Sequence, residues 1–216
     1  AWYVNNQVPA RYFVEAAQKD LGIHEYLTDL AQAQEVGEHG LVALDWHSGN
    51  RSVLVDHELS GILIGATLAT KAEDGYRALL EATAFGTRKI VETFREAGVD
   101  VEEYIVAGGL IKNHFLMQLY SDVTRLPLSV LESEQGPALG SAIHAAVAAG
   151  SYANVRDAAE AMGRVSKSLY KPNEVQAAKY DRLYAEYEIL HDYFGRGAND
   201  AMKRLKAMRR EALDAR

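Results

Sequence analysis

The sequence predicts an α/β domain followed by a helical appendage at the C-terminus. Short apolar runs bounded by glycine, such as Gly40–Asp45 and Ser60–Leu68, are typical of buried strands. Between such runs lie longer segments whose apolar residues recur every three or four positions, which is typical of helices. From Val155 onward the composition shifts to Ala, Glu, Lys, Arg and Tyr, and no further strand is expected. We therefore expect a domain over residues 1–150 and a helical tail over residues 151–216.

The first third of the chain is expected to form two helices and two strands. Pro9 suits the first turn of a helix that runs to Gly22, where glycine favours helix termination. A second helix is expected from about Ile23 to Val36. The strands Gly40–Asp45 and Ser60–Leu68 follow, and both are expected to be buried.

The segment Ala72–Ala97 is the clearest helix of the sequence, and Gly98 follows its end. Its apolar residues fall on one face, which is expected to be buried. That face comprises Tyr76, Leu79, Leu80, Thr83, Ala84, Ile90, Val91 and Phe94. Glu81 lies within the same helix. We expect it at a water-exposed edge, with a carboxylate that orients a ligand in a cleft as the alternative.

The middle of the chain alternates strands and helices. A strand at Tyr104–Ala107 is followed by two glycines and a helix from about Asn113 to Thr124. The strand Leu128–Leu131 comes next, after Pro127. The helix Gly136–Gly150 consists mainly of small residues, which would allow it to lie close against a neighbouring backbone or a ligand.

The tail is expected to form helices at Asn173–Phe194 and Ala198–Ala215. Five tyrosines recur there at helical spacings, and they predict an aromatic packing stripe rather than a binding site. These are Tyr170, Tyr180, Tyr184, Tyr187 and Tyr193.

Composition narrows the class of protein. The chain has 216 residues, 48% of them hydrophobic, which suffices for a sizeable core. It has no apolar run long enough to span a membrane and no cysteine, and its seven histidines lack metal-ligand spacing. We therefore expect no metal held by protein ligands alone. The net charge of −7 disfavours nucleic acid as a partner, so small molecules and proteins remain, and the cytoplasm is the expected location.

The N-terminus is abrupt, since Ala1 is followed directly by Trp2 and Tyr3. Natural termini are usually polar and loose. We interpret Ala1 as a cut point within a longer polypeptide, with removal of an initiator methionine as the alternative.

The stretch AGGLIKN, from Ala107 to Asn113, joins a strand to a helix through two glycines. Gly108 and Gly109 tolerate positive φ and place no Cβ in the way of a ligand. The helix that follows directs its free N–H groups toward the same space, which favours a phosphate or a polar base edge. Asn113 can cap that helix or bond to a ligand. A plain tight turn explains the same residues.

The loop DWHSGNRSVLVD, from Asp45 to Asp56, contains two carboxylates, a guanidinium and an amide within twelve residues. Such a density of polar groups after a strand suits a substrate-facing loop, with Asp45, Asn50 and Arg51 as candidates. In the alternative, Arg51 pairs with Asp45 or Asp56 and Trp46 packs beneath, so that the loop only supports itself.

Together these motifs resemble the C-terminal domain of the FGGY carbohydrate kinases. The similar stretches are LSGILIGATLATKAEDGYRALLEATAFGTRKIVETF, IVAGGLIKNHFLMQLYSDVTRLPL and EQGPALGSAIHAAVAAG. Within the family, NNQVPARY, the DWxxGNRS loop and the long helical tail look most like those of members that phosphorylate L-ribulose. Members that act on xylulose or another sugar remain an alternative. A non-catalytic actin-like module is a further alternative.

The resemblance implies an actin-like, ribonuclease-H-type ATPase domain that is only partly present here. Gly109 and Asn113 match positions that contact adenosine in this family, and Gly108 is the neighbouring glycine of the turn. Gly140 is a further candidate for the same pocket. The implied ligands are ATP, with Mg²⁺ held mainly through its phosphates, and a ketopentose. The general base and the sugar-binding N-terminal domain are expected upstream of this chain, and a homodimer is an open alternative.

Overall fold

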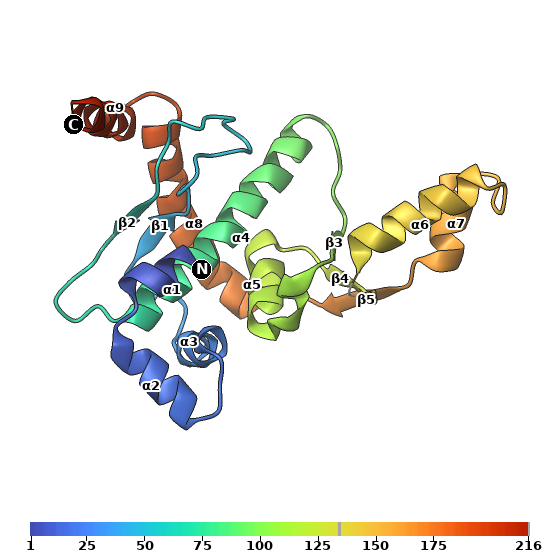
Figure 1. Ribbon diagram of the computed structural model, residues 1–216, viewed down its shortest axis with the longest axis horizontal. Coiled ribbons are helices and arrows are strands. Elements are labelled where there is room, and N and C mark those ends of the chain that lie inside the picture. Colours follow the sequence, from blue (N-terminus) through green and yellow to red (C-terminus); the bar gives the residue numbers. More distant parts are fainter. Residues whose placement is uncertain (134, 216) are drawn as a thin grey trace.

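The computed structural model describes residues 1–133 and 135–215 as an α/β arrangement around one long helix (Figure 1). In chain order its elements are α1 (Trp2–Gln7), α2 (Ala10–Gln18), α3 (Ile23–Gln32), β1 (Val42–Leu44), β2 (Ile62–Ile64), α4 (Ala72–Glu96), β3 (Tyr104–Val106), the 3₁₀ helix η1 (Gly109–Lys112), α5 (His114–Thr124), β4 (Leu128–Leu131), α6 (Gly136–Ala148), α7 (Val155–Met162), β5 (Val165–Tyr170), α8 (Glu174–Gly195) and α9 (Ala201–Asp214). In the described ranges no helix is long and apolar enough to cross a membrane.

The strands form two small sheets. β1 and β2 pair antiparallel, with Val42 opposite Ile64. The second sheet has the order β3–β4–β5, in which β3 and β4 are parallel and β5 is antiparallel to β4. The parallel pair is connected through η1 and α5. This connection places the two glycines after β3 and the first turn of α5 at the same end of the sheet.

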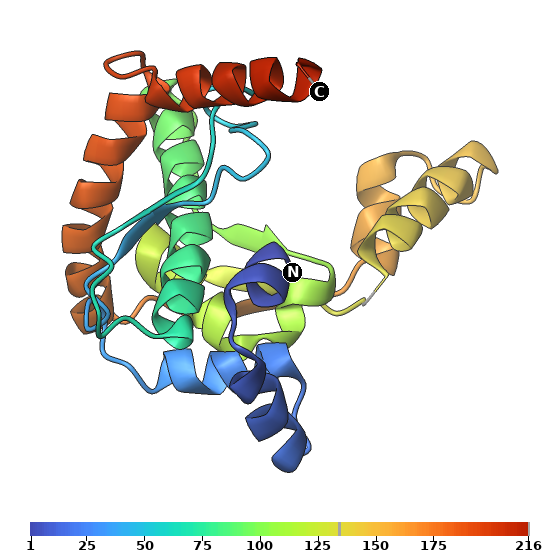
Figure 2. The same ribbon diagram turned by 60° about the vertical axis from the view of Figure 1, so that its left-hand side comes forward.

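The main core lies where α4 crosses β1, α5 and α8. Its centre is Phe85 of α4, whose ring centroid lies 5.4 Å from that of Tyr187 and 5.8 Å from that of Tyr184. Tyr180, Tyr184 and Tyr187 of α8 are all buried. The expected packing stripe is therefore confirmed for these three tyrosines, whereas Tyr193 is 45% exposed and Tyr170 lies on the strand β5 instead of a helix. Figure 2 shows α8 running alongside α4.

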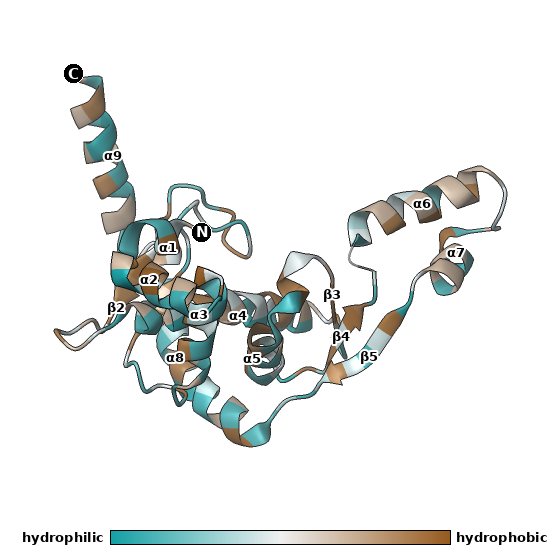
Figure 3. Cartoon of the chain, turned by 60° about the horizontal axis from the view of Figure 1, so that its bottom comes forward, coloured by the Kyte–Doolittle hydropathy of each residue, from teal (hydrophilic) through white to brown (hydrophobic). Residues whose placement is uncertain are grey.

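The expectation that no strand follows Val155 is wrong, because Val165–Tyr170 forms β5. Its outward position Leu169 is 56% exposed, while the small residues Ser166 and Ser168 are half-buried. The strand lacks the alternation of apolar inward and polar outward residues by which strands are recognised. In Figure 3, β3 and β4 are mainly hydrophobic in colour, whereas β5 is mixed. Backbone pairing with β4 holds the strand.

Four smaller expectations differ from the structure. The N-terminal segment contains an additional helix, α1, and the helix after Pro9 ends at Gln18 rather than Gly22. β2 is not buried, since Leu63 and Ile64 are 38% and 40% exposed. The apolar face of α4 is exposed at its last member, Phe94, which lies near the end of the helix.

The helices α6 and α7 pack on each other and project from the rest of the chain (Figures 1 and 2). The small-residue helix α6 therefore has α7 as its neighbour, and Ile143 is its buried residue. A division of the chain near residue 150 stays a prediction.

Candidate functional site

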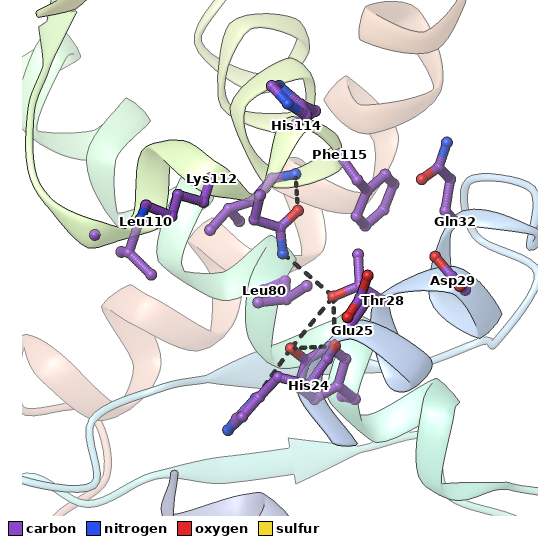
Figure 4. Close-up of a pocket in the computed structure, with 14 residues that line it drawn as sticks. His24, Glu25, Thr28, Asp29, Gln32, Leu80, Leu110, Lys112, His114 and Phe115 are labelled. Atoms are coloured by element: carbon purple, nitrogen blue, oxygen red, sulfur yellow. Dashed lines mark hydrogen bonds between the residues drawn. The ribbon is translucent and has the colours of Figure 1, made fainter. Parts of the chain in front are cut away.

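A cleft of about 710 Å³ lies between α3, α4, η1 and the start of α5 (Figure 4). This volume falls within the range of small-molecule sites, which is about 300–1,000 Å³. The cleft is lined by His24, Glu25, Thr28, Asp29, Gln32, Tyr76, Leu80, Gly109, Leu110, Lys112, Asn113, His114, Phe115 and Leu116. Two of the residues predicted from the sequence, Gly109 and Asn113, are among them.

The two glycines of the turn have different roles in the backbone. Gly108 has φ +99°, a conformation that side chains rarely adopt. Gly109 begins η1, and a Cβ built on it meets no atom of the described residues within 4 Å. The backbone therefore requires glycine at Gly108, whereas at Gly109 the absence of a side chain leaves open space in the cleft.

Asn113 is the N-cap of α5, as one of the two sequence interpretations predicts. Its side-chain Oδ1 accepts a hydrogen bond from the backbone N–H of Leu116 at 2.9 Å. Its Nδ2 donates to Oγ1 of Thr28 on α3 at 3.2 Å. The amide thus links the first turn of α5 to the opposite wall of the cleft.

The α3 wall carries polar groups that the sequence did not single out. Thr28 donates its hydroxyl hydrogen to the carbonyl of His24 at 2.8 Å, and the hydroxyl of Tyr76 lies 3.3 Å from Nδ1 of His24. Glu25 and Asp29 add exposed carboxylates to this wall. In Figure 4 these side chains lie across the cleft from Lys112 and His114. Nothing in the spacing of this helix distinguishes a ligand-facing wall from an ordinary surface helix.

The structure does not bring Gly140 into this cleft. Gly140 lies on the projecting helix α6, and among the residues that the structure describes no atom lies within 4 Å of a Cβ built on it. Gly140 is not among the residues that line the cleft.

The loop candidates also lie outside the cleft lining. Asn50 is only 6% exposed, exchanges two backbone hydrogen bonds with Asp56 and accepts one from the N–H of Leu54 through Oδ1. Trp46 packs beneath the loop, with its ring centroid 5.4 Å from that of His191. These contacts favour a loop that supports itself. However, Asp56 pairs with Lys203 at 2.7 Å rather than with Arg51, which is exposed.

The two carboxyl groups of this loop have pKa values shifted in opposite directions, because the hydrogen bond from Lys203 holds the pKa of Asp56 below its usual value. Burial raises the pKa of the Asp45 carboxyl above its usual value. Burial thus makes the carboxylate form of Asp45 less favourable than it is for an exposed aspartate.

The expectation that Glu81 faces water is wrong, because its side chain is buried between two partners. Its carboxylate accepts from Nε of Arg77 at 2.9 Å and lies 3.0 Å from Nε2 of His39. Arg77 also donates to the carbonyl of Ala31 at 2.8 Å and to that of Gln34, both near the end of α3. A buried carboxylate requires such a partner. The i,i+4 spacing of Arg77 and Glu81 is the sequence signal that indicates the pair.

In the part of the chain that the structure describes, no group of three or more His, Asp or Glu side chains is placed to hold a metal ion. Together, these observations describe an α/β domain with a cleft beside a glycine turn. The model for the FGGY family of carbohydrate kinases, C-terminal domain, matches residues 1–149. The chain belongs to this family.

Proteins named ribulokinase are among those similar in sequence to this chain. The chain is 60% identical, over 98% of its length, to the ribulokinase of Mycolicibacterium smegmatis. It is 54% identical, over 97% of its length, to that of Halalkalibacterium halodurans. In each comparison the chain spans 38% of the relative's own length.

Solved structures agree on the fold. A xylulose kinase from Lactobacillus acidophilus matches with a TM-score of 0.70 at 21% identity, over 86% of this chain and 38% of that one. A xylulose kinase from Rhodospirillum rubrum matches with a TM-score of 0.66 at 28% identity, over 78% of this chain and 33% of that one. The fold is that of the actin-like ATPase domain of these kinases, present in part.

Proposed function

We propose that this chain is the nucleotide-binding, C-terminal part of an ATP-dependent sugar kinase. The complete protein transfers the γ-phosphoryl group of ATP to the terminal hydroxyl of L-ribulose and forms L-ribulose 5-phosphate. The observation that carries this proposal is the 60% identity, along almost the whole chain, to a relative named ribulokinase. Xylulose is the competing substrate, since solved xylulose kinases share the fold.

The nucleotide side of the reaction is assigned to the cleft. Its volume suits a nucleoside, and the open space at Gly109 allows a flat ligand to approach the backbone. The first-turn N–H groups of α5 favour a negative or polar group nearby. Gly109 and Asn113 are the proposed contacts, and Gly108 is the neighbouring glycine that allows the turn beside them. Gly140 is proposed only as support for the pocket, because it does not line the cleft.

The chain contributes positioning rather than covalent chemistry. When bound as its Mg²⁺ complex, ATP supplies the phosphoryl group, and the ion is held mainly by the phosphates and by water. Asn113 and the glycine turn would hold and orient the nucleotide. The walls of the cleft would limit its contact with water.

The sugar side is assigned mainly to the remainder of the longer protein, which would also carry the general base. From this chain, Asp45, Asn50 and Arg51 are the proposed substrate-loop residues. Arg51 is the best placed of them to meet a ligand, because it is exposed, whereas Asn50 is engaged in holding the loop. A cytoplasmic location and a homodimer are also part of the proposal.

A kinase assay on the full-length protein tests this function. With Mg²⁺–ATP we expect higher kcat/KM for L-ribulose than for D-xylulose, and no turnover by the 216-residue chain alone above an Asn113→Ala control. A preference for D-xylulose would mean that D-xylulose, and not L-ribulose, is the substrate. An absence of phosphoryl transfer to any ketopentose or polyol would contradict the enzyme assignment and favour a non-catalytic nucleotide-binding module.

A further inference from the structure

We propose that Thr28 is a positioning residue that fixes the side-chain amide of Asn113 for nucleotide binding. The inference rests on the proposed nucleotide site at Gly109 and Asn113. Thr28 and Asn113 are separated by 85 residues in the sequence, and they meet through one hydrogen bond across the cleft (Figure 4).

The orientation of the Asn113 amide decides what it offers to a ligand. An asparagine presents an acceptor on one side and a two-hydrogen donor on the other, and a rotation of 180° exchanges them. Oδ1 is used by the N–H of Leu116 and Nδ2 by the hydroxyl of Thr28, at 2.9 and 3.2 Å. Both bonds require the same orientation. One hydrogen of Nδ2 then remains for an acceptor atom of the ligand.

The Thr28 hydroxyl can accept a hydrogen bond from Asn113 but has no hydrogen left to donate to it. A threonine hydroxyl has a single hydrogen, and that of Thr28 is directed to the carbonyl of His24 at 2.8 Å. Its lone pairs therefore face Asn113. The hydroxyl of Tyr76 lies 3.5 Å from the same oxygen and 3.3 Å from Nδ1 of His24, so that the threonine is set in a small polar network. An Asn113 amide turned the other way would place oxygen against oxygen.

Loss of the Thr28 hydroxyl should therefore weaken the binding of the nucleotide and not that of the sugar. The amide of Asn113 would keep its capping bond to Leu116 but lose its second constraint. One neutral hydrogen bond contributes about 0.5–1.5 kcal/mol. Since about 1.4 kcal/mol corresponds to tenfold in affinity, the expected loss in ATP affinity is roughly two- to tenfold. The affinity for the sugar should stay the same.

The test compares Thr28→Val with Thr28→Ser in the full-length protein, using equilibrium titration with ATP. Valine keeps the shape of threonine and removes the hydroxyl, whereas serine keeps the hydroxyl. We expect Thr28→Val to raise the Kd for ATP and Thr28→Ser to restore it, with unchanged sugar KM. Thr93→Val is the matched control, because Thr93 makes the same kind of bond, to the carbonyl of Lys89 at 2.8 Å, and does not line the cleft.

A double-mutant cycle with Asn113→Ser separates positioning from general stability. Serine is a good N-cap but lacks the amide donor. If Thr28 acts through Asn113, adding Thr28→Val to Asn113→Ser costs no further ATP affinity. Wild-type affinity in Thr28→Val, or losses that add in the double variant, would overturn the inference while leaving the nucleotide site intact. Wild-type affinity in Asn113→Ser would contradict the nucleotide site itself, and the inference with it.

Discussion

At the scale of single residues, the two glycines of the turn after β3 differ in function: the backbone requires one of them, and space for a ligand requires the other. Gly108 is fixed by its backbone, with φ +99°, whereas a Cβ at Gly109 would meet no atom within 4 Å in residues 1–133 and 135–215. A side chain at Gly109 would instead occupy the cleft. The two glycines are indistinguishable in the sequence.

We therefore expect Gly109→Val to weaken ATP binding by tenfold or more, at a cost of roughly 1 kcal/mol or less in stability. Titration of the full-length protein with ATP and with the sugar gives the two affinities, and thermal unfolding gives the stability. Gly140→Val is the matched comparison, because its Cβ would also meet open space. Equal losses for ATP and sugar in Gly109→Val would argue against the adenosine-side placement, and weakened ATP binding in Gly140→Val would support a role for α6.

The residues of the site were predictable to different degrees. Gly109 and Asn113 could be found because a strand, two glycines and a helix cap follow one another in the sequence. Thr28 could not, because it reaches the site from α3 through tertiary packing, and its neighbours have no distinctive spacing. The burial of Glu81 depends on its ion pair with Arg77, which lies four residues earlier in the same helix, and apolar periodicity alone does not indicate such a pair.

At the scale of elements, α4 carries one buried ion pair, Arg77–Glu81, and a partly exposed one, between Arg88 and Asp181 of α8. Arg77 and Glu81 are 2% and 1% exposed, and Arg77 also bonds to carbonyls at the end of α3. The pair thereby connects the central helix to the α3 wall of the cleft. Removing one partner would leave an uncompensated buried charge.

Glu81→Ala should lower the free energy of unfolding by about 3–5 kcal/mol, measured by denaturant titration of the full-length protein. Glu58→Ala is the control, because Glu58 pairs with Arg210 at 2.8 Å at the surface, where such pairs contribute about 1 kcal/mol or less. A loss for Glu81→Ala no greater than that for Glu58→Ala would mean that the buried pair does not hold α3 and α4 together.

Asp181 connects α8 to α4 and α5, at 2.6 Å from Arg125 and 2.5 Å from Arg88. The hydrogen bond from Arg125, followed by that from Arg88, holds the pKa of the Asp181 carboxyl below its usual value. Its contribution to stability is therefore complete above the pKa of the unfolded chain, about 3.9, and is lost as the pH falls through the lower pKa of the folded state.

Asp181→Asn should accordingly reduce stability at pH 6 and reduce the further loss between about pH 5 and pH 2, because asparagine does not titrate in this range. Unfolding midpoints measured across this range compare the two proteins. An identical pH dependence of stability in wild type and variant would show that the ion pairs of Asp181 do not contribute to the stability of the fold. The effect should also shrink with added salt, since Asp181 is partly exposed.

At the scale of the whole molecule, the order of strands and helices followed from apolar periodicity and glycine placement. The α4 and α5 helices and the strands β3 and β4 begin and end close to the predicted residues. β5 could not be predicted, because serines occupy two of its half-buried positions, Ser166 and Ser168, and the strand is held by pairing with β4. The exposure of β2 and the projection of α6 and α7 depend on which elements lie nearby, which periodicity does not report.

The cleft between α3 and α5 is the site that we propose for the nucleotide of a larger kinase. Hydrogen exchange of the full-length protein, with and without Mg²⁺–ATP, tests it most directly. ATP should slow the exchange of backbone amides in residues 108–116 and in α3, and leave α9 unchanged. Unchanged exchange throughout α3 and residues 108–116 at saturating ATP would show that the nucleotide does not bind in this cleft.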